Sequence, residues 1–124
     1  MTKQKLTMDI KIRRAYDCVT SSDGYRVLVD RIWPRGLSKK ELRIDCWMKD
    51  LAPSTPLRKW YGHDPKKWKQ FKKRYFGELA DHPDLIDELI ALGQKSVITL
   101  VFAAKDQEHS NAAALRDYLI QNPA

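Results

Sequence analysis

Two short, strongly apolar segments constrain the fold of this chain more than any other feature of its sequence. Residues 25–32 contain Val-Leu-Val at their centre, and residues 96–102 contain Val-Ile-Thr-Leu-Val-Phe. A continuous apolar run of this length is typical of a strand that is buried on both faces, as strands of parallel sheets are. Helical patterns occupy most of the chain between the two segments. We therefore predict an α/β fold, with a small and at least partly parallel sheet and helices packed around it in three α/β/α layers.

The remaining elements are predicted from periodicity and from residues that begin or end helices. Residues 9–16 alternate apolar and charged side chains, which indicates a third strand but does not determine its partner. Residues 38–41 (Ser-Lys-Lys-Glu) form a capping-box pattern, which predicts a helix from there to about residue 50. Residues 64–79 begin with Asp-Pro and predict another helix. Further helices are predicted over residues 54–61, over residues 83–92 with Gly93 as the closing residue, and over residues 109–120.

Length and composition bound the class of protein. A chain of 124 residues is expected to form one domain, over residues 1–124, with residues 1–8 as a loose polar segment. The hydrophobic share of 43% is too high for a disordered polyelectrolyte, despite a net charge of +7. The chain has no apolar run long enough to cross a membrane and no export-signal pattern near its start. We therefore expect a cytoplasmic protein with no membrane partner.

Cysteine and histidine spacing gives no sign of a metal site. Cys18 and Cys46 lie in no C-x-x-C pattern and are expected to be reduced thiols, although the sequence leaves open a disulfide between them. His63, His82 and His109 are scattered, and none has a second histidine or a cysteine at ligand spacing. The glycines form no phosphate-binding loop motif. We expect no metal and no cofactor.

Dense polar clusters follow the two apolar segments, at the point where each predicted strand ends. Because ligands of open α/β sheets bind outside the carboxyl ends of the strands, parallel neighbours would bring both clusters to one edge. The cations there would hold a small anion such as a phosphate, since Arg offers a planar fork and Lys a point charge. The predicted ligand-binding residues are Arg31, Trp33, Arg35, Lys105 and Asn111, and the candidates for catalysis are Asp30, His63, Asp106 and His109.

The roles within this predicted site follow from charge and titration. Flanking cations are expected to lower the pKa of Asp30 and Asp106, which favours orienting the cations or a water over acting as general base. His63 and His109 are the candidates for proton transfer, because an imidazole titrates near neutrality. Taken singly, each of these residues is better explained as a rim ion pair, a turn or a helix start. Only their convergence would make a site, and the sequence leaves open whether hydrolase or transferase chemistry accompanies binding.

A second function is suggested by the helix predicted over residues 65–79. It carries six basic side chains next to Trp60 and Tyr61, a composition that nucleic-acid-binding surfaces use. The aromatic residues of the helix fall on its apolar stripe, so the better interpretation is a core-facing stripe with a solvated lysine face. A non-catalytic protein-interaction module is the third alternative.

Several longer motifs carry a resemblance to a known family. Residues 30–39 (DRIWPRGLSK), 47–54 (WMKDLAPS), 57–65 (LRKWYGHDP) and 103–106 (AAKD) resemble the YeaO-like proteins, small bacterial proteins of unknown function. The resemblance spans about residues 10–119. It implies a bacterial cytoplasmic protein of compact α/β form and no established reaction. The motif positions that it covers, without assigning them roles, are Asp30, Arg31, Trp33, Pro34, Arg35, His63, Lys105, Asp106, His109 and Asn111.

The chain departs from the pattern of longer members of this family in one segment. Those members carry a Cys-His-Arg triplet after the last strand. Here the matching stretch is residues 108–111 (Glu-His-Ser-Asn), so His109 is retained while the thiol and the arginine are not. The resemblance therefore implies that a thiol-based mechanism does not carry over to this chain.

Overall fold

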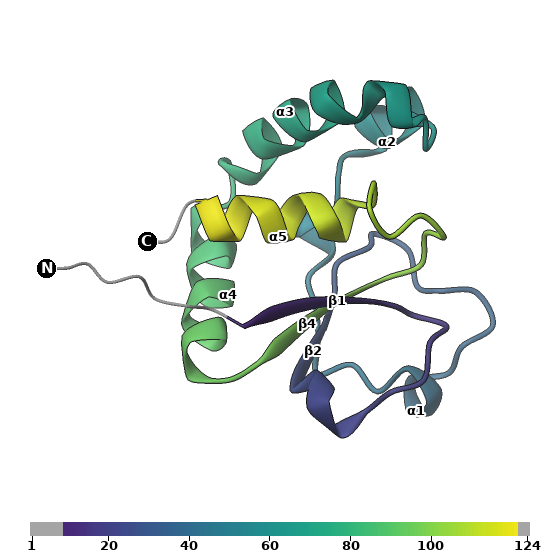
Figure 1. Ribbon diagram of the computed structural model, residues 1–124, viewed down its shortest axis with the longest axis vertical. Helices are drawn as coiled ribbons and strands as arrows, with labels where there is room; N and C mark the ends of the chain where they lie inside the picture. Colours follow the sequence, from purple (N-terminus) through teal and green to yellow (C-terminus); the bar gives the residue numbers. More distant parts are fainter. Residues whose placement is uncertain (1–8, 122–124) are drawn as a thin grey trace, which may run out of the picture.

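The computed structural model describes residues 9–121, so the loose segment predicted at residues 1–8 lies outside the described residues. Within that range the chain forms a four-stranded sheet that is parallel throughout, in the order β1-β4-β2-β3 (Figure 1). The prediction of an α/β fold with a small parallel sheet is confirmed. The strands are β1 (Ile10–Arg14), β2 (Tyr25–Leu28), β3 (Cys46–Trp47) and β4 (Ile98–Phe102).

The most apolar strand, β4, lies between two others. β1 pairs with one edge of β4 and β2 with the other, so that Ile12 and Val27 both lie opposite Leu100. All the residues of β4 are buried, because strands flank it on both edges and a core covers each face of the sheet. The partner of β1, which the sequence did not determine, is therefore β4. Because β2 and β4 are parallel neighbours, their carboxyl ends lie at the same edge of the sheet.

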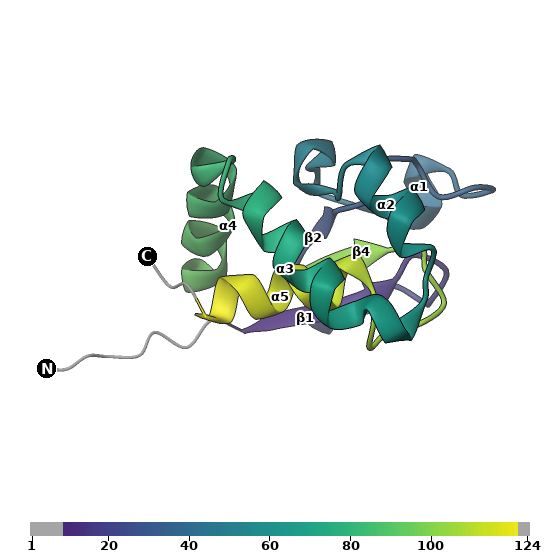
Figure 2. The same ribbon diagram turned by 90° about the horizontal axis from the view of Figure 1, so that it is seen from above.

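The helices are divided unequally between the two faces of the sheet (Figures 1 and 2). Four of them supply buried side chains to one large core, together with residues of β1, β2 and β4. The periodicity of their apolar residues, which predicted them, provides the face that packs on the sheet. These helices are α2 (Thr55–Tyr61), α3 (Trp68–Leu79), α4 (Pro83–Lys95) and α5 (Asn111–Gln121).

The other face of the sheet is covered more thinly. A single helical turn, α1 (Lys39–Leu42), and the loop after β2 form a smaller core there with Leu28 and Val101. Trp33 and Leu37 of that loop pack against it. No helix of residues 9–121 is long and apolar enough to cross a membrane. The cytoplasmic location and the single-domain organisation stay predictions.

The helix predicted over residues 38–50 is much shorter in the structure. The predicted capping box forms, but α1 ends because Arg43 adopts a left-handed conformation, with φ of 50°. The Asp45 carboxylate then accepts a hydrogen bond from the Arg26 backbone N–H (2.8 Å), and the Asp45 N–H donates to the Arg26 carbonyl (2.8 Å). These bonds carry the chain into β3, which pairs with β2. The prediction was wrong because helical pattern alone does not reveal an available sheet edge.

Three other predicted boundaries differ from the structure. Gly93 does not close its helix; it is buried inside α4, which continues to Lys95. Asp64 caps its helix as predicted, accepting from the Lys66 N–H (3.0 Å), but the first turn is a 3-10 helix that precedes α3. β2 ends at Leu28, earlier than the predicted residue 32.

A buried ionic cluster joins elements on the face that α1 covers. The Asp23 carboxylate is 1% exposed and accepts hydrogen bonds from Arg13 Nε (3.0 Å), Arg26 Nη1 (2.7 Å) and the Thr20 hydroxyl (2.9 Å). Burial alone would raise the pKa of Asp23, but the bonds from Thr20 and Arg26 outweigh it and lower the pKa. The Arg26 guanidinium also donates to the Leu42 carbonyl at the end of α1 (2.8 Å). The two buried charges, Asp23 and Arg26, are thus paired with each other, while the second cation, Arg13, is partly exposed to solvent.

At Gly24, directly before β2, the backbone packs closely against the residue that precedes β4, and a substitution there tests how close this approach is. Its φ is +65°, and a Cβ there would lie 2.2 Å from the Val97 carbonyl oxygen. We expect Gly24→Ala to lower the free energy of unfolding by at least about 2 kcal/mol, because backbone strain and a backbone clash both oppose it. Urea-induced unfolding followed by circular dichroism measures this change.

Gly77 provides the matched control. It lies inside α3, and apart from its chain neighbours and the backbone of its own helix, no atom of the described residues stands within 4 Å of the position that its Cβ would take. Gly77→Ala should therefore raise the free energy of unfolding by about 0.5–1 kcal/mol, through helix propensity alone. Similar effects of the two substitutions would contradict the close approach at Gly24.

Candidate functional site

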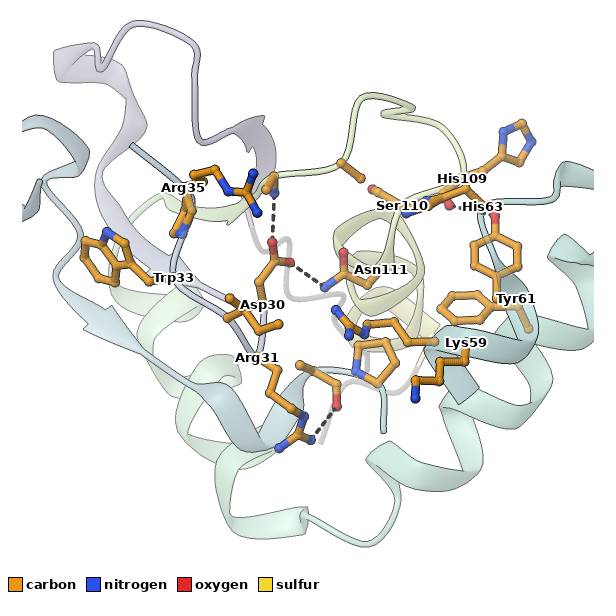
Figure 3. A pocket seen from close by; sticks show the side chains of 18 of the residues that line it. Asp30, Arg31, Trp33, Arg35, Lys59, Tyr61, His63, His109, Ser110 and Asn111 are labelled. Carbon is orange, nitrogen blue, oxygen red and sulfur yellow. Dashed lines mark hydrogen bonds between the residues drawn. The ribbon is translucent and has the colours of Figure 1, made fainter. Parts of the chain in front are cut away.

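A pocket of about 490 Å³ lies where β2 and β4 end (Figure 3). Its walls come from stretches of chain that are distant in the sequence: the loop after β2, the segment around α2, the loop after β4 and the start of α5. The two polar clusters thus meet at one edge of the sheet, as expected of parallel neighbours. Of the predicted site residues, the pocket brings together Asp30, Arg31, Trp33, Arg35, His63, His109 and Asn111.

Asp30 lies in the middle of the site and joins the ends of several elements. One of its carboxylate oxygens accepts from the backbone N–H of Ala103 (2.9 Å), just after β4. The other accepts from Nδ2 of Asn111 (3.0 Å), the first residue of α5 (Figure 3). Asn111 Nδ2 also donates to the Val29 carbonyl (3.1 Å), and Trp47 Nε1 donates to the Asp30 carbonyl (2.7 Å). The carboxylate therefore fixes the relative position of the strand ends and the helix.

The pKa of Asp30 is raised above its usual value of 3.8. Burial is the largest cause, and it outweighs the hydrogen bonds from Ala103 and Asn111 and the positive charges of Arg58 and His63, all of which lower the pKa. The prediction that flanking cations lower this pKa is therefore wrong in its net direction. The sequence showed the neighbouring charges but not how deeply the carboxyl group lies.

Four cationic side chains line the pocket, against the single carboxylate of Asp30. Arg35, Arg58 and Lys59 are exposed, and none of them takes part in an ion pair with another residue of the described chain. Arg31 is half-buried and donates to the Ala52 carbonyl (3.5 Å), while its Nε is buried without a partner among residues 9–121. Figure 3 shows the guanidinium of Arg31 directed away from Asp30. The exposed cations are thus the ones available to a ligand.

The two histidines of the pocket are held in different ways. His63 has φ of 57° and follows Gly62 at 54°, so two successive residues adopt a left-handed conformation. Such a conformation is strained in a residue other than glycine, and strain of this kind clusters at functional sites.

His109 Nδ1 lies 2.8 Å from the Asp106 carboxylate, and its ring meets the Trp68 ring edge-on at 5.2 Å. The hydrogen bond from His109 lowers the pKa of Asp106, in the predicted direction.

Lys105 and Asp106 do not line the pocket. Both are exposed on the loop after β4, and the Asp106 carboxylate accepts the backbone N–H groups of Glu108 (3.0 Å) and His109 (3.1 Å). Asp106 therefore stabilises the turn before α5, which agrees with the structural explanation of these residues. The structure does not bring Lys105 to the position of an anion ligand, because the chain leaves the pocket wall after Ala104.

Trp33 serves the smaller core as well as the pocket. Its Nε1 donates to the Leu37 carbonyl (2.6 Å), and its ring meets the Trp47 ring edge-on at 5.4 Å. The Trp33 side chain packs against the smaller core and also lines the pocket, so part of its ring is available for contact with a ligand.

Sequence reasoning missed the contribution of α2 and of residue 110 to the site. Tyr61 stacks on Phe71 at 4.2 Å, and its hydroxyl donates to the His109 carbonyl (2.8 Å), which joins α2 to the start of α5. Burial, with smaller effects of nearby carboxylates, raises the pKa of Tyr61 to about 12. The sequence signal for these residues is the motif at 57–65, which carried the family resemblance but no role. The pocket residues not predicted as site residues include Tyr16, Arg58, Lys59, Tyr61, Phe71 and Ser110.

The basic helix α3 places two of its four aromatic residues in the core, while Trp68 and Phe76 are only partly buried. Phe71 and Tyr75 are buried, as the apolar stripe predicted. Trp60, which precedes the helix, lies under two cations: Lys67 Nζ stands 5.0 Å and the Arg74 guanidinium 4.1 Å from its ring centroid. These contacts describe a solvated basic face over packed aromatics rather than aromatics exposed to stack on bases.

The described residues offer no thiol or metal cluster at the pocket. Cys18 is exposed and Cys46 lies on β3, and neither lines the pocket. Within residues 9–121 no group of three His, Cys, Asp or Glu side chains is placed to hold a metal ion. The arrangement can bind an anion through its exposed cations and can accept hydrogen bonds at Asp30.

Comparison with known proteins gives relatives without an assigned activity. A family model described as "Inactive DUF488-N3 subclade" matches residues 9–124. The chain is 40% identical over 112 residues to the uncharacterized protein YeaO of Escherichia coli K12, covering 90% of this chain and 97% of that protein. It is 44% identical over 110 residues to the uncharacterized protein Rv3073c of Mycobacterium tuberculosis H37Rv, covering 89% of this chain and 92% of that protein. No solved structure matches the chain significantly.

The titration of Asp30 tests the geometry of the pocket. We expect its carboxyl carbon resonance to titrate with a midpoint above 3.8, while that of Asp106 in the same sample titrates below 3.8. Asn111→Ala should raise the Asp30 midpoint further, because it removes a donor to the carboxylate.

A raised folded-state pKa also means that Asp30 contributes most to stability below pH 3.8, and that this contribution is lost as the pH rises through the folded value. An Asp30 midpoint no higher than that of Asp106 would show that the carboxyl group is solvated.

Proposed function

Because the chain belongs to the inactive DUF488-N3 subclade, we propose that its pocket binds a small anionic, phosphate-bearing ligand without catalysing a reaction on it. The observation that carries this proposal is the charge balance of the pocket lining, which contains four cationic side chains and a single carboxylate, with three of the cations exposed. Surplus positive charge in a concave site attracts anions and raises their local concentration.

Three of these cations form what we call the mouth of the pocket: Arg35, Arg58 and Lys59. They come from the loop after β2 and from α2, so the fold brings them together although they are distant in the sequence. All three are exposed and have no ion-pair partner within residues 9–121, so a ligand would not have to displace one. Hydrogen bonds between such groups and a phosphate contribute about 1.5–3 kcal/mol each, so two of them can hold a small anion.

Binding without chemistry is favoured by what Asp30 already does. Both of its carboxylate oxygens accept hydrogen bonds that fix the strand ends and α5, so its position is structural as well as functional. The segment at residues 108–111 has neither the thiol nor the arginine of longer family members. Hydrolase or transferase chemistry therefore has no support from a nucleophilic thiol in the pocket.

Phosphate-binding affinity of single-residue variants tests the proposal. We expect Arg35→Ala and Arg58→Ala each to weaken pyrophosphate binding by about tenfold, measured by isothermal titration calorimetry at low ionic strength, because each removes a charged hydrogen bond. Lys40→Ala, on the exposed side of α1, removes the same charge away from the pocket and should leave the affinity unchanged.

Two results would count against the anion site. Equal losses for Arg35→Ala and Lys40→Ala would mean that only net charge matters. If Lys69→Ala and Lys73→Ala on α3 weakened binding of the polyanion while the mouth variants did not, the basic helix would be the binding surface instead.

A further inference from the structure

We propose that the natural ligand is a phosphate ester that carries neutral hydroxyl groups, with its phosphate among the mouth cations and its hydroxyls donating to Asp30 and Asn111. This inference rests on the proposed anion site and adds the class of ligand to it. We call Asp30 and Asn111 the floor of the pocket; both are half-buried, and Figure 3 shows them facing each other in the middle of the site.

The floor offers hydrogen-bond acceptors and no free donor from its side chains. The two hydrogens of Asn111 Nδ2 are used on the Val29 carbonyl (3.1 Å) and the Asp30 carboxylate (3.0 Å). The amide oxygen of Asn111 accepts no hydrogen bond from the rest of residues 9–121. Each Asp30 oxygen accepts one hydrogen bond within that range and has capacity for another. A ligand group that fits the floor must therefore be a donor.

The phosphate cannot be the group that contacts the floor. A phosphate oxygen is itself an acceptor, and the Asp30 carboxylate would repel it. The mouth and the floor thus require opposite hydrogen-bonding roles from one ligand, an anionic acceptor at one end and a donor at the other. This separation distinguishes the pocket from a simple phosphate site.

A neutral donor fits the floor better than a cationic one. Four cationic side chains line the pocket, and the charges of Arg58 and His63 act directly on Asp30. An ammonium group would enter against these charges, whereas a hydroxyl group would not. Burial also leaves the Asp30 carboxylate short of solvent donors, as its raised pKa reflects, so hydroxyl donors from a ligand would restore what burial removed.

The size and walls of the pocket suit a ligand larger than phosphate. A volume of about 490 Å³ lies within the usual range for small-molecule sites. Trp33, Tyr61 and Phe71 contribute apolar surface to the lining of the pocket, which the carbon skeleton of a phosphate ester can contact.

A matched pair of phosphate esters tests the inference on the unmodified protein. Glycerol 3-phosphate and propyl phosphate have the same carbon chain and the same anionic group, and only the first has hydroxyls. We expect glycerol 3-phosphate to bind at least about tenfold more tightly by calorimetry, because two donors reach the floor. Asp30→Asn and Asn111→Leu should each reduce this affinity ratio toward one, while Arg35→Ala should weaken both ligands and keep the ratio.

The outcomes separate this inference from the proposed function. If the two esters bind the unmodified protein equally well, the hydroxyl requirement is wrong and the anion site stands. Tighter binding of phosphoethanolamine than of glycerol 3-phosphate would overturn the neutral-donor class in favour of an ammonium group. If no phosphate compound binds at millimolar concentration, both the inference and the anion site are wrong. Because the ratio is measured first on the unmodified protein, poor folding of a floor variant does not remove the test.

Discussion

The two hydrogen bonds that the Asp30 carboxylate accepts, from Ala103 and from Asn111, are the interaction on which the rest of the site depends. They join Asp30, the second residue after β2, to the residue directly after β4 and to the start of α5. Parallel pairing of β2 with β4 puts these segments at one edge of the sheet, and the carboxylate fixes them there. The Asp30 side chain therefore holds together the segments after β2 and β4 and the start of α5, which form part of the pocket lining.

The same residue gives the pocket its polarity. The lining of the pocket contains the acceptor groups of Asp30 together with exposed cations contributed by the loop after β2 and by α2. The position of α2 at this edge is stabilised by contacts within the pocket lining, where the Tyr61 hydroxyl donates to the His109 carbonyl and the Tyr61 ring stacks on Phe71. On the opposite face, Asp23 joins β1, β2 and α1 through ion pairs with the partly exposed Arg13 and the buried Arg26, whose guanidinium also donates to the Leu42 carbonyl.

Particular residues show where prediction from sequence succeeded and where it failed. The apolar runs predicted an at least partly parallel sheet, and β2 and β4 meet the condition set on the site, since they are parallel neighbours. Asp30, Arg35, His109 and Asn111 accordingly line one pocket. The prediction of a helix to residue 50 was wrong, because the hydrogen bonds between Asp45 and Arg26 lead the chain along the edge of β2, where it pairs as β3. Lys105 was predicted in the site because it follows a strand, but it does not line the pocket. The direction of a side chain beyond a strand end depends on the path of the loop, which the sequence pattern does not give.

By itself the sequence determined the secondary-structure class, an at least partly parallel sheet and the strand ends at which polar residues gather, because apolar periodicity and helix caps are local properties of the chain. Only the tertiary structure decided which cations reach the pocket and how deeply Asp30 is buried. Arg58 and Lys59 lie on a helix whose position over the sheet depends on packing with distant residues. The raised pKa of Asp30 depends on solvent access, and solvent access is a property of the assembled fold that no stretch of sequence contains.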